Sequence, residues 1–268
     1  MSAEPARPPI AVIGGSGFYE FLDDPRQARI ETPYGDPSAA VSLGAVAGQA
    51  VAFLPRHGSH HEFPPHRVNY RANLWALRSL GVRRVLAPCA VGSLQAALGP
   101  GALVVPDQLI DRTSGRVQTY MDSGAAHVGF ADPYCPDLRH ALTSADDAIV
   151  DNGTMVVVEG PRFSTRAESQ WYAAQGWSLV NMTGHPEAVL ARELALCYAT
   201  IALVTDRDAG IETGEAVSQA EVFAEFERSI ERLRDLLVDV ITTVSPEQEA
   251  GCGCGASLDG FDLPFALP

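Results

Sequence analysis

The chain has 268 residues and carries 33 acidic against 19 basic side chains, which gives a net charge of −14. A field of that sign repels nucleic acid and anionic membranes, so any bound anion needs a local cationic pocket. No stretch approaches the roughly 18 uninterrupted apolar residues of a membrane span, and the first residues lack the pattern of a signal peptide. We therefore expect a soluble, cytoplasmic protein of one domain, with no nucleic-acid or membrane partner.

Apolar, β-branched runs alternate with helical patterns along the chain, which is typical of an α/β fold. The runs are continuous rather than alternating in hydrophobicity, so we expect most of these strands to be covered on both faces. The predicted strands are 9–13, 50–54, 84–87, 102–105, 154–158, 178–182 and 198–205.

Capping residues predict where several helices begin. Thr165 and Ser218 each precede a glutamate three positions later, the capping-box pattern, and Pro186 suits the first position of another helix. The last helix is predicted over 218–243, where apolar residues recur at helical spacing. The pattern ends there, so residues 246–268 are predicted to form a flexible tail.

The cysteines show no C-x-x-C pair and no histidine at zinc spacing. We interpret them as buried thiols and predict no metal site. A C-x-C within GCGCG (251–255) could form a strained disulfide or hold a metal, but its place in the predicted tail favours a mobile extension. The five cysteines are Cys89, Cys135, Cys197, Cys252 and Cys254.

A glycine-rich stretch, VIGGSGF (12–18), follows the first predicted strand. Glycines allow several backbone N–H groups to point at one spot, and Ser16 adds a hydroxyl, which together make an anion nest. The stretch lacks the G-x-G-x-x-G pattern of dinucleotide binding and the lysine of a P-loop. An anion site and a purely structural turn are both compatible with it.

Further anion-binding groups follow two other strands. Arg56 and His57 come after the strand 50–54, where a guanidinium fork and an imidazole suit phosphate oxygens. The histidines that follow could instead hold a metal, but they lack helical spacing and accompanying carboxylates, so we favour the anion site. Thr183, before a helix start, offers a hydroxyl and nearby backbone N–H groups.

Two aspartates, Asp206 and Asp208, end the buried strand 198–205. Carboxylates are costly to bury without partners, so the pair indicates a ligand with donor groups. In open α/β sheets ligands bind beyond the carboxyl ends of strands, where the anion-binding residues also lie in this interpretation. Phe163, just before a helix, fits either a hydrophobic staple or stacking on a planar ligand.

Five motifs, in their order and spacing over residues 8–245, resemble the 5′-methylthioadenosine phosphorylases of the trimeric purine nucleoside phosphorylase superfamily. The resemblance implies a single α/β domain with a central mixed sheet flanked by helices, active as a homotrimer in purine and methionine salvage. The implied reaction converts 5′-methylthioadenosine and phosphate to adenine and 5-methylthioribose 1-phosphate, without metal or organic cofactor. The motifs are IGGSGF, PRHGSHHEFPPHRVNYRANLWAL, VVVEGPRFSTRAES, NMTGHPE and TDRDAG.

The same resemblance implies roles for individual residues. Phosphate contacts are implied for Ser16, Arg56, His57, Thr183 and a turn at Cys89 and Ala90. Nucleoside contacts are implied for Phe163, Met182, Asp206, Arg207, Asp208, Val222 and Phe223, and for His127 of a neighbouring subunit. Specificity is implied to depend on Ser164 and Gln219. The catalytic set is Asp206, Asp208, Arg56 and His57.

The two aspartates favour adenine, because a carboxylate accepts a hydrogen bond from the N6 amino group and repels a 6-oxo group. Close carboxylates also tend to share a proton. We expect Asp206 to donate to N7 and Asp208 to accept from N6, although the two roles could be reversed.

Departures from the family pattern leave the 5′ group open. Cys89 replaces a usual threonine or serine, Gln219 replaces an apolar residue, and Phe223 is bulkier than the usual leucine. One alternative is therefore a phosphorylase for another 5′-substituted nucleoside, such as a 5′-deoxy or 5′-halo nucleoside or methylthioinosine. A second alternative is a nucleoside- or phosphate-binding protein without turnover.

Overall fold

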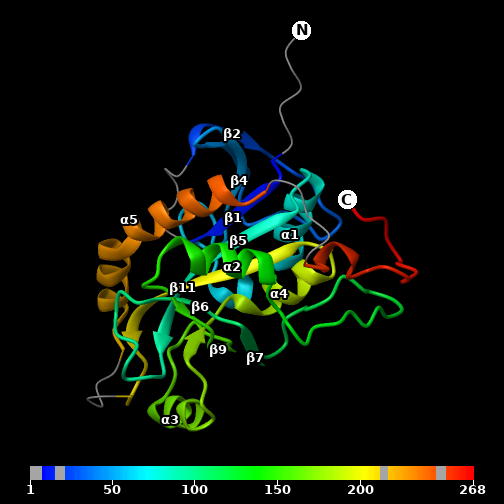
Figure 1. Cartoon of the computed structure of the whole chain (residues 1–268). Helices are drawn as coiled ribbons and strands as arrows, with labels where there is room; N and C mark the ends of the chain where they lie inside the picture. The colour runs from blue at the N-terminus through cyan, green and yellow to red at the C-terminus, as the bar shows by residue number, and fades with distance from the viewer. Residues whose placement is uncertain (1–7, 16–21, 212–216, 246–251) are drawn as a thin grey trace.

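A branched, mixed sheet organises the part of the chain that the structure describes. The structure is a computed structural model and describes residues 8–15, 22–211, 217–245 and 252–268 (Figure 1). The strands are β1 (Ile10–Gly14), β2 (Asp23–Ala28), β3 (Val41–Val46), β4 (Gln49–Pro55), β5 (Arg84–Ser93), β6 (Leu103–Val105), β7 (Gln108–Arg112), β8 (Val150–Asp151), β9 (Thr154–Val158), β10 (Leu179–Asn181) and β11 (Cys197–Arg207). The α-helices are α1 (Tyr70–Ser79), α2 (Pro136–Ala145), α3 (Arg166–Ala174), α4 (Gly184–Arg192) and α5 (Gln219–Thr243).

Each strand predicted from the sequence is present, and the α/β class with a mixed sheet is confirmed. Strands β2, β3, β7 and β8 and helix α2 were missed. The sequence of β2 is DDPRQA and its residues are mostly exposed, so this edge strand carries no apolar run. Strands of this kind form because a neighbour supplies hydrogen bonds, which a hydrophobicity pattern does not register.

The sheet branches at its longest buried parallel pair, β5 with β11. The path β2-β3-β4-β1-β5-β10-β9-β7 runs through β5, while β11 pairs with the other edge of β5 and carries β6 and β8 beyond it. Along the first edge, β1 pairs with Arg84–Leu86 and antiparallel β10 pairs with Gly92 and Ser93. Residues 87–91 of β5 are left between these two partners, and this gap becomes the wall of the cavity described below.

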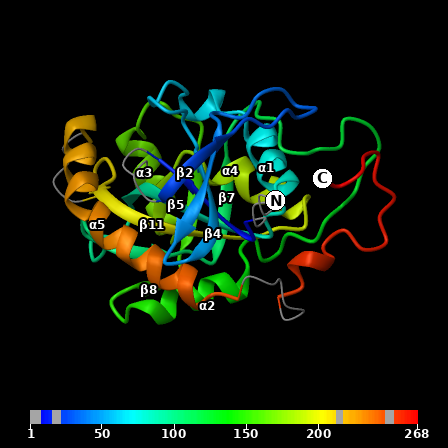
Figure 2. The same ribbon diagram turned by 90° about the horizontal axis from the view of Figure 1, so that it is seen from above.

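Helices cover both faces of the sheet, each over its own apolar core (Figures 1 and 2). Helices α1 and α4 bury Leu74, Leu77 and Leu190 against one face. Helices α2 and α5 bury Leu138 and Leu237 against the other. This three-layer arrangement explains why the central strands read as continuous apolar runs.

Both predicted capping residues begin their helices. Thr165 and Glu168 form a complete capping box at α3, and the Ser218 hydroxyl accepts a hydrogen bond from the Glu221 N–H at α5. The apolar stripe of α5 divides along its length: its later residues are buried in the core, whereas Phe223 is 42% exposed. The first turn is therefore available to a ligand. Neither α5 nor any other helix in the described ranges combines the length and apolarity needed to cross a bilayer.

The tail is packed where the structure describes it, which corrects the prediction of a flexible segment for residues 252–268. The Phe265 ring lies edge-on to Trp75 with centroids 5.5 Å apart and close to Tyr120 at 6.1 Å. The Ser257 hydroxyl donates to the Arg192 carbonyl, and Cys254 is buried. The sequence pattern did not predict this because the tail forms little regular structure and is held by contacts with distant residues.

We expect Phe265→Ala to lower the free energy of unfolding by about 1–2 kcal/mol, because it removes a partly buried ring. Hydrogen exchange should accelerate in residues 252–268 and not in α5. Phe261→Ala is the matched control, since Phe261 lies in the same tail but is 39% exposed. Equal effects of the two substitutions on unfolding and exchange would contradict the packing described here.

Candidate active site

A cavity of about 450 Å³ opens beside the gap in the β5 edge. It is enclosed by residues that follow β4 and β9, by the middle of β5, by the ends of β10 and β11, and by the first turns of α5. The predicted site residues that line it are Arg56, His57, Cys89, Ala90, Phe163, Ser164, Met182, Thr183, Asp206, Asp208, Gln219, Val222 and Phe223. Most of the residues predicted from separate motifs therefore share one space.

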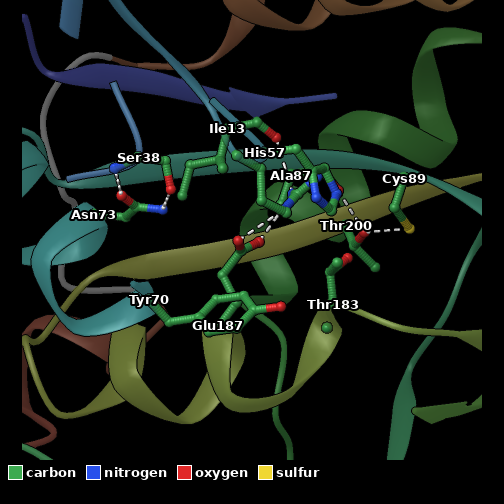
Figure 3. Close-up of polar contacts among 12 residues, drawn as sticks. Ile13, Ser38, His57, Tyr70, Asn73, Ala87, Cys89, Thr183, Glu187 and Thr200 are labelled. Atoms are coloured by element: carbon green, nitrogen blue, oxygen red, sulfur yellow. Dashed lines mark hydrogen bonds and ion pairs between the residues drawn. The ribbon is translucent and has the colours of Figure 1, made fainter. Parts of the chain in front are cut away.

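Arg56 is fixed at one end of the cavity by a buried ion pair with Glu187 of α4. Figure 3 labels Glu187 together with His57 and Thr183. Its Nε and Nη2 donate to the two carboxylate oxygens at 2.8 and 2.9 Å, and Nη2 and Nη1 also donate to the carbonyls of Ile13 and Pro88. Burial opposes the charge, but the Glu187 carboxylate raises the pKa of Arg56 above its ordinary value. The guanidinium is thus a permanent, oriented cation at the cavity wall.

His57 stands beside this cation in its neutral form. Burial, together with the charge of Arg56, lowers the pKa of His57 to about 4. Its Nδ1 lies 2.8 Å from the Phe63 carbonyl, an acceptor, so the ring proton is on Nδ1 and Nε2 carries a lone pair. His57 is therefore suited to accept a hydrogen bond from a protonated phosphate or a hydroxyl.

The predicted turn at Cys89 and Ala90 is instead the middle of strand β5, which is a correction. The Ala90 carbonyl accepts from Asn181 Nδ2 at 3.2 Å across the gap. Because the N–H and carbonyl of one strand residue lie on the same edge, the Ala90 N–H also faces the cavity. The Cys89 side chain lies 3.4 Å from the Thr200 hydroxyl, and burial raises the pKa of its thiol.

Thr183 contributes differently from the sequence prediction. Asn181 Oδ1 accepts hydrogen bonds from the backbone N–H groups of Thr183 and Gly184 at 2.7 and 2.6 Å. These donors were expected to bind an anion, and they are used inside the protein because a buried asparagine oxygen needs partners. The Thr183 hydroxyl, 3.4 Å from Asn181 Oδ1, remains the group that Thr183 directs to the cavity.

The two aspartates lie at the other end of the cavity and have different environments. Burial raises the pKa of Asp206 to about 6. The Thr205 hydroxyl, which donates to this carboxylate, opposes the shift, and the smaller effect of the Asp208 charge adds to it. The Asp208 carboxylate accepts from the Ser169 hydroxyl at 2.6 Å. A Cβ at Gly92 would lie 3.1 Å from Asp206 Oδ1 and 3.3 Å from Asp208 Cβ, so glycine permits this close approach.

Apolar side chains form the wall between the two ends. Phe163 and Met182 face the cavity from the chain after β9 and β10, and Val222 and Phe223 face it from α5. The Ser164 hydroxyl is buried without a hydrogen-bond partner in the described part of the chain, and it also lines the cavity. A planar apolar ligand with a few polar groups suits such a wall.

Three predicted residues are not brought into this cavity. Arg207 lies on the opposite face of β11 from its neighbour, because side chains alternate along a strand, and its Nε and Nη2 lie 3.4 Å from the Ala96 carbonyl. Its predicted substrate contact is therefore wrong for this chain. His127 lies on an exposed loop outside the cavity, so its contact across a subunit boundary stays a prediction. Ser16 lies outside the described residues.

Sequence reasoning missed the residues that hold the site in shape. Glu187, Asn181 and Ser169 were given no role in the site. Each is a polar side chain within an otherwise buried segment, which is the signal that could have identified it. The one described group of side chains arranged to hold a metal ion is a cysteine cluster, and none of its members lines the cavity.

Glu187→Gln should lower the free energy of unfolding by about 3 kcal/mol, because it leaves the buried Arg56 cation without its counter-charge. Urea unfolding of the two proteins measures the difference. Asp122→Asn is the matched control: it also removes a carboxylate paired with an arginine, but the Asp122 side chain is 72% exposed, so the change should stay below about 1 kcal/mol. A Glu187→Gln loss no larger than that of the control would contradict a structural role for the pair.

Comparisons with known proteins agree with this geometry. Residues 9–242 match the model of the phosphorylase superfamily. The chain is 62% identical to an S-methyl-5′-thioadenosine phosphorylase of Mycolicibacterium smegmatis, over 97% of this chain and 99% of the relative. It is 57% identical to a purine nucleoside phosphorylase of Streptomyces coelicolor, over 97% of each. Its fold matches a methylthioadenosine phosphorylase from an Antarctic soil metagenomic library with a TM-score of 0.86 and 42% identity, over 94% of this chain and 91% of that one. The chain belongs to the phosphorylase superfamily.

Proposed function

We propose that this chain catalyses the phosphorolysis of 5′-methylthioadenosine, giving adenine and 5-methylthio-α-D-ribose 1-phosphate. The observation that carries the proposal is the division of one cavity into a cationic end at Arg56 and a two-aspartate end at Asp206 and Asp208. Phosphate and a purine base need these opposite environments. Similarity to phosphorylases of that name supports the same substrate.

The phosphate end positions the nucleophile. Arg56 supplies the charge, the Ala90 N–H and the Thr183 hydroxyl supply donors, and neutral His57 accepts from the protonated phosphate oxygen. A phosphate oxygen then forms a bond to C1′ of the ribose while the C1′–N9 bond breaks and its electron pair passes to the purine. Binding phosphate and nucleoside in a fixed orientation lowers the barrier, because the entropy of bringing the two reactants together is lost on binding and not in the chemical step.

The aspartate end stabilises the leaving base. Asp206, with its raised pKa, retains a proton near neutral pH for a larger fraction of the time than an ordinary carboxyl group. That proton is placed to pass to N7 as negative charge builds on the ring. The mechanism requires no cofactor, and inorganic phosphate is the co-substrate.

The base is proposed to be adenine because Asp208 is an oriented acceptor. The Ser169 hydroxyl donates to one of its oxygens, which leaves the other to accept from the N6 amino group. A 6-oxopurine would place an acceptor against that remaining oxygen and leave both atoms without a donor.

Preference among 5′ groups rests on the start of α5. Val222 and Phe223 offer an apolar contact for a methylthio group, whereas the Gln219 amide adds a polar group at the same end of the cavity. A second candidate function, phosphorolysis of another 5′-substituted purine nucleoside, is favoured by that glutamine.

A homotrimer is proposed from the family pattern, with the loop of His127 completing the site of a neighbouring subunit. The exposure of this loop and of Phe223 at the cavity mouth is compatible with such a contact. The roles in methionine and purine salvage and the cytoplasmic location stay predictions.

A substrate panel tests the proposal. Phosphate-dependent release of free base from methylthioadenosine should exceed that from methylthioinosine by at least about 100-fold in kcat/KM, because the 6-oxo group cannot donate to the Asp208 oxygen that Ser169 leaves open. Asp208→Asn should reduce this ratio, since an amide can donate to the 6-oxo group.

Asp235→Asn is the control for that panel, because Asp235 is an exposed residue of α5 outside the cavity, and it should leave the ratio unchanged. A wild-type preference for 6-oxo substrates would refute the base assignment. Absence of any phosphate-dependent base release would refute the activity itself.

The pH dependence of the Asp206→Asn variant tests the proton donor. The substitution should lower kcat/KM by about 10²–10⁴-fold. The protonated form of Asp206 is present below its pKa of about 6 and is lost as the pH rises through that value, so the wild-type advantage over the variant should shrink from pH 5 to pH 7.

The titration of phosphate itself affects both proteins equally and cancels in their ratio. A ratio that is constant across this range would remove Asp206 from proton transfer. Unchanged turnover in Asp206→Asn would remove it from the chemistry altogether.

A further inference from the structure

Four of the five cysteines come together at one point, away from the cavity. Their Sγ atoms all lie within 4.8 Å of one another, and the Sγ atoms of Cys197 in β11 and Cys252 in the tail are 3.5 Å apart. We call this group the four-cysteine cluster; its members are Cys135, Cys197, Cys252 and Cys254. The fifth, Cys89, lines the cavity instead.

The cluster joins three distant parts of the chain. Cys135 precedes α2, Cys197 is the first residue of β11, and the last two lie in the tail. Three of the four residues are at most 2% exposed and Cys252 is half-buried. Two members are anchored in the core, because their N–H groups donate to the carbonyls of Tyr198 and Arg83 at 2.8 and 2.9 Å.

The spacing of the sulfur atoms suits one tetrahedral ion. Zinc binds thiolate at about 2.3 Å, so four sulfur ligands around it lie roughly 3.8 Å from one another. The 3.5 Å separation is close to that value, and no separation in the cluster exceeds 4.8 Å. Disulfides, by contrast, need two close pairs and give no reason for all four atoms to converge on a common centre.

Local backbone geometry favours the same interpretation. Gly253 has a φ of +67° between Cys252 and Cys254, and this turn lets both thiols of the C-x-C face the same centre. Cys135 caps the N-terminus of α2, where the helix dipole stabilises the negative charge of a thiolate.

We propose that the four-cysteine cluster is a structural zinc site that fastens the tail to the core. Four thiolate ligands leave no open coordination position, so the ion takes no part in phosphorolysis. The site extends beyond the proposed function and does not depend on it. It also revises the prediction of no metal site, since the ligands are brought together only by the tertiary fold.

Elemental analysis of the full chain, purified with zinc present and without chelators, tests the site directly. We expect about one zinc ion per chain. Cys254→Ser should weaken zinc binding by at least about 100-fold in competition with a chromophoric chelator, since even changes outside the ligand shell cost 10–100-fold.

Cys252→Ser provides a second variant, since its half-buried position makes it less of a risk to folding, and it should lose zinc in the same way. Cys89→Ser is the matched control and should retain the zinc content of the wild type. Replacement of zinc by cobalt should give the visible absorption of tetrahedral cobalt thiolate in the wild type and in Cys89→Ser, but not in Cys254→Ser.

The site also predicts a stability effect. Removal of zinc by a chelator should lower the Tm of the wild type and of Cys89→Ser and make residues 252–268 susceptible to proteolysis, whereas the same treatment should leave the Tm of Cys254→Ser unchanged.

Three results would overturn the proposal. An intact mass lower by two hydrogen atoms for each bond would show disulfides in place of the metal. Zinc-free protein in which all cysteines react with a thiol reagent, and which gives no cobalt spectrum, would show simple thiols. Iron in place of zinc would overturn the choice of ion.

Discussion

The site depends on one unpaired stretch of backbone in the middle of the sheet. Strand β5 is paired along one edge by β11, but on its other edge the pairing with β1 ends at Leu86 and the pairing with β10 begins at Gly92. Buried carbonyls in such a gap need partners, and Arg56 and Asn181 supply them. The side chains that bind these backbone carbonyls therefore also form part of the cavity wall.

The charged groups at the two ends of the cavity differ in character because their partners differ. At the Arg56 end a full cation is retained in a buried position because Glu187 lies against it, and Tyr198 donates a further hydrogen bond to that carboxylate at 2.8 Å. At the other end burial raises the pKa of Asp206, and the charge of Asp208 acts in the same direction. One cavity thus holds a fixed positive charge and a carboxyl group whose pKa is raised to about 6.

The four-cysteine cluster lies next to residues that lead to the Arg56–Glu187 ion pair. Tyr134 and Tyr198 stack with centroids 6.2 Å apart, and each is followed or preceded directly by a member of the four-cysteine cluster. Tyr198 in turn contacts Glu187. A metal ion bound by the four cysteines would therefore restrain Tyr198, which contacts the Arg56–Glu187 ion pair, as well as the tail.

The sequence alone determined the α/β class, the buried strands, two helix caps and the motifs that meet in the cavity. These features depend on short-range patterns: hydrophobic runs, capping residues and polar groups at strand ends. The match to known motifs added the reaction class and further cavity-lining residues, such as Met182, Val222 and Phe223.

Only the tertiary structure decided what depends on contacts between distant residues. The branch at β5 turned an expected loop at Ala90 into a strand, Asn181 took the N–H groups expected for an anion, and strand alternation removed Arg207 from the cavity. The tail and its cysteines followed the same rule. The core residue that Cys252 contacts, Cys197, is 55 residues away in sequence, so no local pattern could reveal that the tail is packed.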